Sequence, residues 1–201
     1  MRSFGRRMHM RRAHELLWLL LALCVGAAAL RADALDGLLE VKSAYAQPEQ
    51  GVYQLFARVA YPVNDDIRAA LKDGLTLTFD LDVVVSRERR FWVDETIAEY
   101  TLKRELSYHA VSDRYVMRDL DPRNGGEQHS YPTVEEALDA LGTVDSWPFL
   151  LKAQLNPSRQ YRVSLRAGVR RGRLPDTLRV LLFWTDDWHR ESEWFSWSLP
   201  L

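Results

Sequence analysis

The chain has 201 residues, with 27 basic and 28 acidic side chains. Residues 1–34 hold six of the basic and two of the acidic side chains, so the remaining 167 residues carry 21 against 26, a net charge of −5. A body of that length can bury a hydrophobic core as one domain, and its acidic balance argues against nucleic-acid binding, which needs a positive surface.

The first 34 residues predict an export signal. Five arginines precede an apolar run at 16–30, and Ala32-Asp33-Ala34 follows it with the Ala-x-Ala pattern that signal peptidase prefers. Cleavage there would leave residues 35–201 as one soluble domain in the periplasm. The run is short for a membrane span, which takes about 20 residues, but an uncleaved anchor in the inner membrane is the alternative. Both leave the domain outside the cytoplasm, because basic residues before an apolar run stay on the cytoplasmic side.

Alternation of apolar and polar residues with period two predicts strands along most of the remaining chain. The pattern is clearest at 53–61, 75–85 and 161–169. Weaker patterns predict further strands at 38–45, 97–109, 114–119, 149–155, 178–184 and 193–199. Short strands separated by turns are typical of sandwiches and barrels. We therefore expect a mainly β fold, an antiparallel β-sandwich that is immunoglobulin-like in general architecture.

Two short helices are expected between the strands. The first covers 65–73, begins after Asn64 and ends at Gly74. The second covers 134–141, where Thr133 and Glu136 have the spacing of a capping box. Its apolar residues recur at the helical period, and Gly142 is expected to end it in the left-handed conformation.

Six short segments of the body, taken in order, carry a resemblance to a known family. They are AALKDG at 69–74, RRFWVD at 89–94, LSYHA at 106–110, VEEAL at 134–138, RLPDTLR at 173–179 and SEWFSW at 192–197. From about Leu38 to its end, the chain resembles a family of exported proteobacterial domains of unknown function. Genes of that family often lie beside one for a sensor kinase of the nitrogen-regulation type, so the resemblance implies a partner of that class and no activity.

The C-terminal aromatic residues and an arginine stripe are the candidate binding residues. Exposed tryptophans bind sugars, peptides or protein partners, and Trp188 and Trp194 are the candidates for this role. Phe195, Trp197 and Leu199 share the opposite strand face, which we expect to join the core. The outward arginines Arg162, Arg166 and Arg170 could meet an acidic partner or lipid headgroups, or form a solvated strand face.

No catalytic, cofactor or metal signature stands out. The single cysteine, Cys24, lies in the leader, so the body has no disulfide and no thiol nucleophile. Carboxylates surround His189 without a recognised ligand spacing, and no serine lies in a nucleophile elbow. We expect no cofactor, no metal site and no enzymatic activity.

These observations favour a non-catalytic interaction or sensory-accessory domain of the cell envelope. Its partner would be an envelope protein, with a membrane sensor kinase as the candidate that the resemblance implies. No nucleic acid is expected, and the membrane would be touched only by the N-terminal segment. A sugar- or peptide-binding domain that uses the C-terminal tryptophans is the alternative. A hydrolase whose site is assembled only in space comes third.

Overall fold

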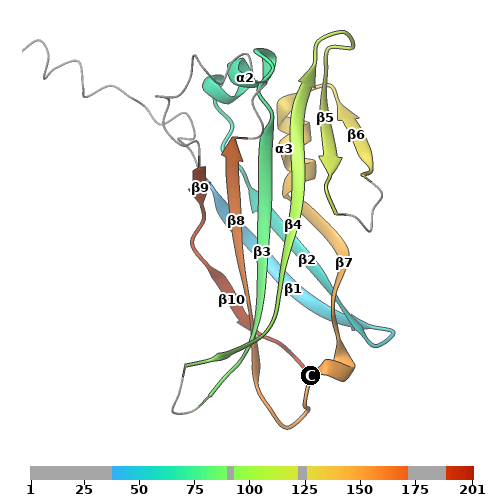
Figure 1. The fold of residues 1–201 in the computed structure, drawn as a ribbon, viewed down its shortest axis with the longest axis vertical. Helices are drawn as coiled ribbons and strands as arrows, with labels where there is room; N and C mark the ends of the chain where they lie inside the picture. The colour runs from blue at the N-terminus through green and yellow to red at the C-terminus, as the bar shows by residue number, and fades with distance from the viewer. Residues whose placement is uncertain (1–37, 90–92, 122–125, 172–188) are drawn as a thin grey trace, which may run out of the picture. The chain divides into compact units, whose positions relative to one another are not determined.

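The computed structural model describes residues 38–89, 93–121, 126–171 and 189–201, and shows a mainly β fold with two antiparallel sheets (Figure 1). The smaller sheet has the order β1–β2–β7, with bounds Glu40–Glu49, Val52–Ala60 and Thr143–Leu151. The larger, seven-stranded sheet has the order β10–β8–β3–β4–β5–β6, and β9 also pairs with β8. Its strands are β3 (Leu77–Arg87), β4 (Glu95–His109), β5 (Arg114–Asp119), β6 (Gln128–Tyr131), β8 (Tyr161–Arg171), β9 (His189–Glu191) and β10 (Phe195–Ser198).

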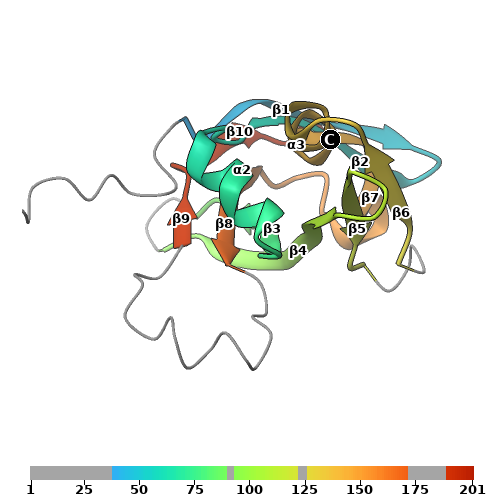
Figure 2. The same ribbon diagram turned by 90° about the horizontal axis from the view of Figure 1, so that it is seen from above.

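The core lies between the two layers that these sheets form (Figure 2). Strands β2, β3 and β8 each bury every second side chain, because neighbouring residues of a strand point to opposite faces. The buried set includes Leu77, Phe79, Leu81, Tyr161, Val163 and Leu165, all in one hydrophobic cluster. The inward faces predicted from the alternation at 75–85 and 161–169 are therefore confirmed.

Both expected helices are present, and local hydrogen bonds set their starts. Helix α2 (Asp65–Lys72) begins after Asn64, whose side chain accepts a 2.8 Å hydrogen bond from the Ile67 amide. The residue after its cap, Gly74, has φ of +90°, which favours glycine and ends the helix. Helix α3 (Val134–Gly142) begins after Thr133, whose hydroxyl accepts from the Glu136 amide.

The role predicted for Gly142 is wrong. Helix α3 continues through Gly142, which has no positive φ, and Thr143 caps the helix in an extended conformation. The glycine is needed because the backbone of β2 comes very close. A Cβ atom at Gly142 would lie 2.0 Å from the carbonyl oxygen of Val59, so the requirement is space and not backbone handedness.

Three strands differ from the sequence prediction. Strand β7 starts at Thr143 and not at 149, because Ser146 (φ +56°) and Pro148 interrupt the alternation. The strand predicted at 149–155 ends at Leu151, and Lys152–Gln154 form a short 3₁₀ helix, η3. Strands β6 and β9 are short and polar and carry no apolar alternation. The strand predicted at 178–184 lies outside the described residues.

Removing one hydroxyl should test how the C-terminal segment is fastened to the smaller sheet. Tyr53 is fully buried, and its hydroxyl donates a 2.7 Å hydrogen bond to the carbonyl of Pro200. Tyr53→Phe keeps the ring and leaves that carbonyl without this donor. We expect the free energy of unfolding in urea to fall by about 1 kcal/mol. An unchanged unfolding midpoint would show that the contact contributes nothing.

Candidate functional site

The outward face of the seven-stranded sheet brings together the charged residues singled out in the sequence. On β8, Arg162, Arg166 and Arg170 alternate with buried residues and so point away from the core. On β3, Asp80 and Asp82 do the same. The antiparallel register aligns Asp82 with Arg166 and places Asp80 next to Arg170. Two strands far apart in the sequence therefore place opposite charges side by side.

Each of the three arginines forms an ion pair on this face. Arg170 Nε lies 3.1 Å from Asp80 Oδ2, and Arg162 donates to Glu88 Oε1 at 2.7 Å. Arg166 contacts two carboxylates, with 3.4 Å to Asp82 Oδ2 and 2.5 Å to Glu191 Oε2. Because carboxylates accompany every arginine, the stripe is a line of ion pairs and not an isolated positive surface.

Trp194 lies on top of this line. Arg166 Cζ is 4.7 Å from the centre of the Trp194 ring, within the range of a cation–π contact. The side chain is 46% exposed, whereas Leu199 is buried and Phe195 and Trp197 are half-buried against the core. The predicted division of the C-terminal aromatic residues between an outward and a core-facing side is confirmed for the part that the structure covers. Trp188 falls outside that part.

A bulge between β9 and β10 places Trp194 there. Ser192 interrupts the edge strand, and its backbone amide donates to the Ala167 carbonyl at 2.8 Å. Its hydroxyl accepts from the Ala167 amide at 3.0 Å and donates to the carbonyl of Glu193. These bonds fix the backbone just before the tryptophan. Bulges commonly redirect one side chain in this way.

A row of contacts crosses the sheet from Trp194 to β4. Arg166 links the tryptophan to Asp82, and Asp82 Oδ1 accepts a 2.9 Å hydrogen bond from the hydroxyl of Thr101. We call Trp194, Arg166, Glu191, Asp82 and Thr101 the cross-sheet row. In it, an exposed ring and a guanidinium are held in place by neighbours on four strands.

Asp80, beside the row, sits in a partly desolvated position. Burial raises the pKa of its carboxyl above the ordinary value, and the positive charges of Arg170 and Lys103 act in the opposite direction. The side chain is only 15% exposed. Its ion pair with Arg170 is therefore better shielded from water than the pair of Arg162 and Glu88.

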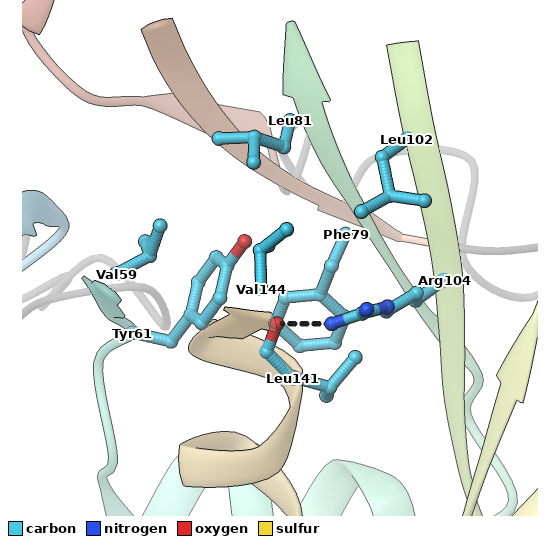
Figure 3. A pocket seen from close by; sticks show the side chains of 8 residues that line it. All are labelled: Val59, Tyr61, Phe79, Leu81, Leu102, Arg104, Leu141 and Val144. Carbon is cyan, nitrogen blue, oxygen red and sulfur yellow. Dashed lines mark hydrogen bonds between the residues drawn. The ribbon is translucent and has the colours of Figure 1, made fainter. Parts of the chain in front are cut away.

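A cavity between the two sheets is too small to hold a ligand. It has a volume of about 10 Å³, at the lower limit for one water molecule. Tyr61, Phe79 and Arg104 line it together with aliphatic side chains of both sheets and α3 (Figure 3). Burial strongly raises the pKa of Tyr61, which keeps its hydroxyl neutral. The cavity is a small packing gap beside a buried arginine.

Arg104 is a largely buried charged residue that sequence reasoning did not single out. It points to the core side of β4 and donates to the carbonyls of Leu141 at 2.9 Å and Thr143 at 3.0 Å. Its Nε lies 4.0 Å from Asp119 Oδ2, and the two side chains are 17% and 11% exposed. It satisfies the C-terminal carbonyls of α3, a structural role. The one available signal was an arginine on the apolar side of an alternating strand.

Two histidines of the larger sheet, His109 and His189, lie in exposed positions. His109 Nδ1 is 2.8 Å from Ser112 Oγ, but His109 ends β4, Ser112 lies in the turn that follows, and both are exposed. His189 Nε2 is 3.3 Å from Glu191 Oε1 at the sheet edge. Within the described ranges no group of three or more His, Cys, Asp or Glu side chains could hold a metal ion. Asp186 and Asp187 are outside those ranges.

In the part of the chain that the structure covers, no helix is both long and apolar enough to span a membrane. The leader and its apolar run at 16–30 are not included in that part. The tether proposed for this run therefore stays a prediction.

Comparison with known proteins adds a family and no activity. A family model described as a domain of unknown function, DUF4390, matches residues 38–198. No curated protein matches the chain, and no solved structure does.

Proposed function

The chain belongs to the DUF4390 family, and we propose that it acts as a non-catalytic interaction domain of the cell envelope. In this proposal the cross-sheet row contacts an envelope protein. A membrane sensor kinase is the specific candidate, supported by the family resemblance. The β-sandwich, immunoglobulin-like in general architecture, serves as a rigid support for the surface; two antiparallel sheets over one core support that part of the proposal.

The observation that carries the proposal is the exposed tryptophan held over an anchored arginine. Tryptophan and arginine are the residues most enriched in the energetic centres of protein interfaces. Here Trp194 covers the guanidinium of Arg166, and Asp82 and Glu191 hold that guanidinium from the sides. Side chains fixed before binding lose less conformational entropy when a partner arrives. The row therefore combines the residue types and the rigidity that a contact surface needs.

The charges of the outward face around the row also indicate what kind of partner fits. Arginines and carboxylates alternate across the face, so a partner surface that is strongly basic or strongly acidic would not complement the whole face. A partner with both charges around an apolar centre would pair with them and cover the Trp194 ring. That pattern suits a folded protein surface better than nucleic acid. A sugar or peptide stacked on Trp194 is the alternative.

Export is the second element of the proposal, and the leader supports it. We expect N-terminal sequencing of the protein recovered from the periplasm to begin close to Leu35, because the Ala-x-Ala pattern ends at Ala34. Recovery of the chain only from membranes, with Met1 retained, would indicate an uncleaved membrane anchor instead of a cleaved signal. Recovery of the intact chain from the cytoplasm would contradict export.

Removing the exposed ring should weaken partner binding and leave the fold intact. Trp194→Ala should reduce the amount of crosslinked envelope partner roughly tenfold, the size of effect expected for a central interface tryptophan. The melting temperature should fall by no more than about 4 °C, because an exposed cation–π contact contributes at most about 1 kcal/mol to stability.

Tyr45→Ala is the matched control for that experiment. Tyr45 is 48% exposed and stacks on Phe56 on the outward face of the other sheet, with ring centres 4.9 Å apart. We expect this variant to keep full capture. Equal loss in both variants, or no loss in either, would show that the cross-sheet row is not the contact surface.

A further inference from the structure

Strand β4 has a long side on which the structure describes no partner strand. β3 pairs with it from Glu95 to Leu106, whereas β5 pairs only with Arg104–His109 on the other side. In Figure 1, β5 lies beside only the upper part of β4. Among the residues that the structure describes, nothing adds a strand to this side of 95–103. We call 95–103 the open edge.

The open edge carries fewer of the features by which the other edges avoid pairing. Natural proteins shorten, bulge or interrupt exposed edge strands to prevent addition of another strand. Strand β1 has a register shift after Val41 and carries Pro48, and β7 carries two register shifts and Pro148. Strands β6, β9 and β10 have only four, three and four residues. The open edge has nine residues and no proline; its register with β3 shifts once, between Thr96 and Ala98, and is regular from Ala98 onward.

The backbone groups that face this side can be assigned. The carbonyl of Lys103 accepts a 2.9 Å hydrogen bond from the Leu120 amide, just after the end of β5, so it points to the side on which β5 lies. In an antiparallel strand, alternate residues direct both their amide and their carbonyl to the same side. Thr101 and Glu99 therefore present their amides and carbonyls at the open edge. These are the groups that an added strand would pair with.

The side chains along the open edge define what the added strand should look like. On the core side, Tyr100 is half-buried and meets Trp147 and Phe149 edge to face, with ring centres 6.1 and 6.2 Å apart. On the outward side, Glu99 is exposed near the middle of the stretch, while Glu95 at its end is already bound by Arg87 and Arg89. An added strand needs apolar residues over Tyr100 and a basic residue opposite Glu99.

We propose that an extended segment of a partner protein adds to the open edge as a strand, with alternate apolar residues and a basic residue opposite Glu99. A second copy of this chain fits poorly. Antiparallel self-pairing over the whole stretch puts Glu99 opposite its own counterpart, and like charges directly opposite are destabilising. A register shifted toward Thr101 runs the second strand into Arg104, which Asp119 already pairs with.

The test uses a phage library of random nine-residue peptides and the protein purified from cells that express the full chain. We expect enriched peptides to alternate apolar and polar residues and to carry a central Lys or Arg. Thr101→Pro removes an amide at the open edge and should weaken binding of these peptides about tenfold or more, since proline also blocks a neighbouring strand. Thr101→Ala keeps the amide and loses only the hydroxyl bond to Asp82, so peptide binding should persist.

Further variants keep the test decisive. Glu99→Lys should weaken binding of the enriched peptides by a similar factor, because it reverses the charge opposite their basic residue. If Thr101→Pro does not fold, the Glu99→Lys variant tests the proposal in its place. Trp194→Ala should leave peptide binding unchanged, because the open edge is separate from the ring. Failure of the open-edge proposal can thus be distinguished from failure of the proposed partner contact at the cross-sheet row. No enrichment, equal binding to Thr101→Pro, or a dimer that Thr101→Pro abolishes would each overturn the proposal.

Discussion

Replacing Arg104 by methionine should lower the free energy of unfolding by roughly 3 kcal/mol, because a largely buried ion pair and the hydrogen bonds to two carbonyls are lost. The substitution leaves Asp119, which is 11% exposed, without its guanidinium neighbour. It also removes the donor from the carbonyls of Leu141 and Thr143, at the end of α3. Buried carbonyls that lose their donor add to the penalty. Methionine has similar length, so lost packing is a small part of the effect.

Urea unfolding of the Arg104→Met and Lys103→Met variants should separate this role from general charge effects. Lys103 is the neighbouring residue, but it is exposed on the outward side of β4. We expect Lys103→Met to change stability by less than about 0.5 kcal/mol, as surface substitutions usually do. Similar midpoints for both variants would contradict a structural role for the buried arginine.

Replacing Gly142 by alanine should cost roughly 3 kcal/mol, the upper range for an added methyl group in a packed site. The new Cβ would meet the Val59 carbonyl oxygen at 2.0 Å, and this atom belongs to the backbone of β2. Backbone within a sheet cannot rotate away as a side chain can. Helix α3 would have to move from β2, which would also disturb the carbonyls that Arg104 holds.

Gly168→Ala is the matched control. Thermal and urea unfolding curves of both variants provide the comparison. Its added Cβ would meet the Arg190 carbonyl oxygen at 3.8 Å and Asp80 Cβ at 3.9 Å, which are ordinary contacts. We expect Gly168→Ala to be near neutral. A mild effect at both positions would mean that α3 and β2 adjust freely, and that the close approach is not a constraint.

Local signals predicted the helix starts and the inward sides of the main strands. Asn64 and Thr133 cap helices by bonds within three residues, so the sequence contains all the needed information. Alternation along β3 likewise placed Phe79 in the core and Asp80 outside it, because this pattern is also contained in the local sequence. The short strands β6 and β9 and the interrupted β7 give no such pattern, because tertiary pairing and not residue preference makes them strands.

The candidate site was predictable in its parts and not in its assembly. Alternation along one strand put Arg162, Arg166 and Arg170 on one side. It could not show that Asp82 and Glu191 neutralise Arg166, because strand order brings β3 and β9 to β8. The stacking of Trp194 on Arg166 likewise depends on the bulge at Ser192. The arginine stripe thus becomes part of a row in which two carboxylates pair with Arg166 beneath an exposed ring.

Site-specific photo-crosslinking in intact cells should show whether the cross-sheet row contacts an envelope partner. A photoreactive amino acid at Ser196 would sit in β10 on the outward side, two residues after Trp194; one at Gln47 would sit on the outward side of the other sheet. We predict a discrete adduct from position 196 that disappears when Trp194 is also alanine, and none from position 47. The absence of an adduct from position 196, or an adduct that persists without the tryptophan, would contradict a partner contact at the cross-sheet row.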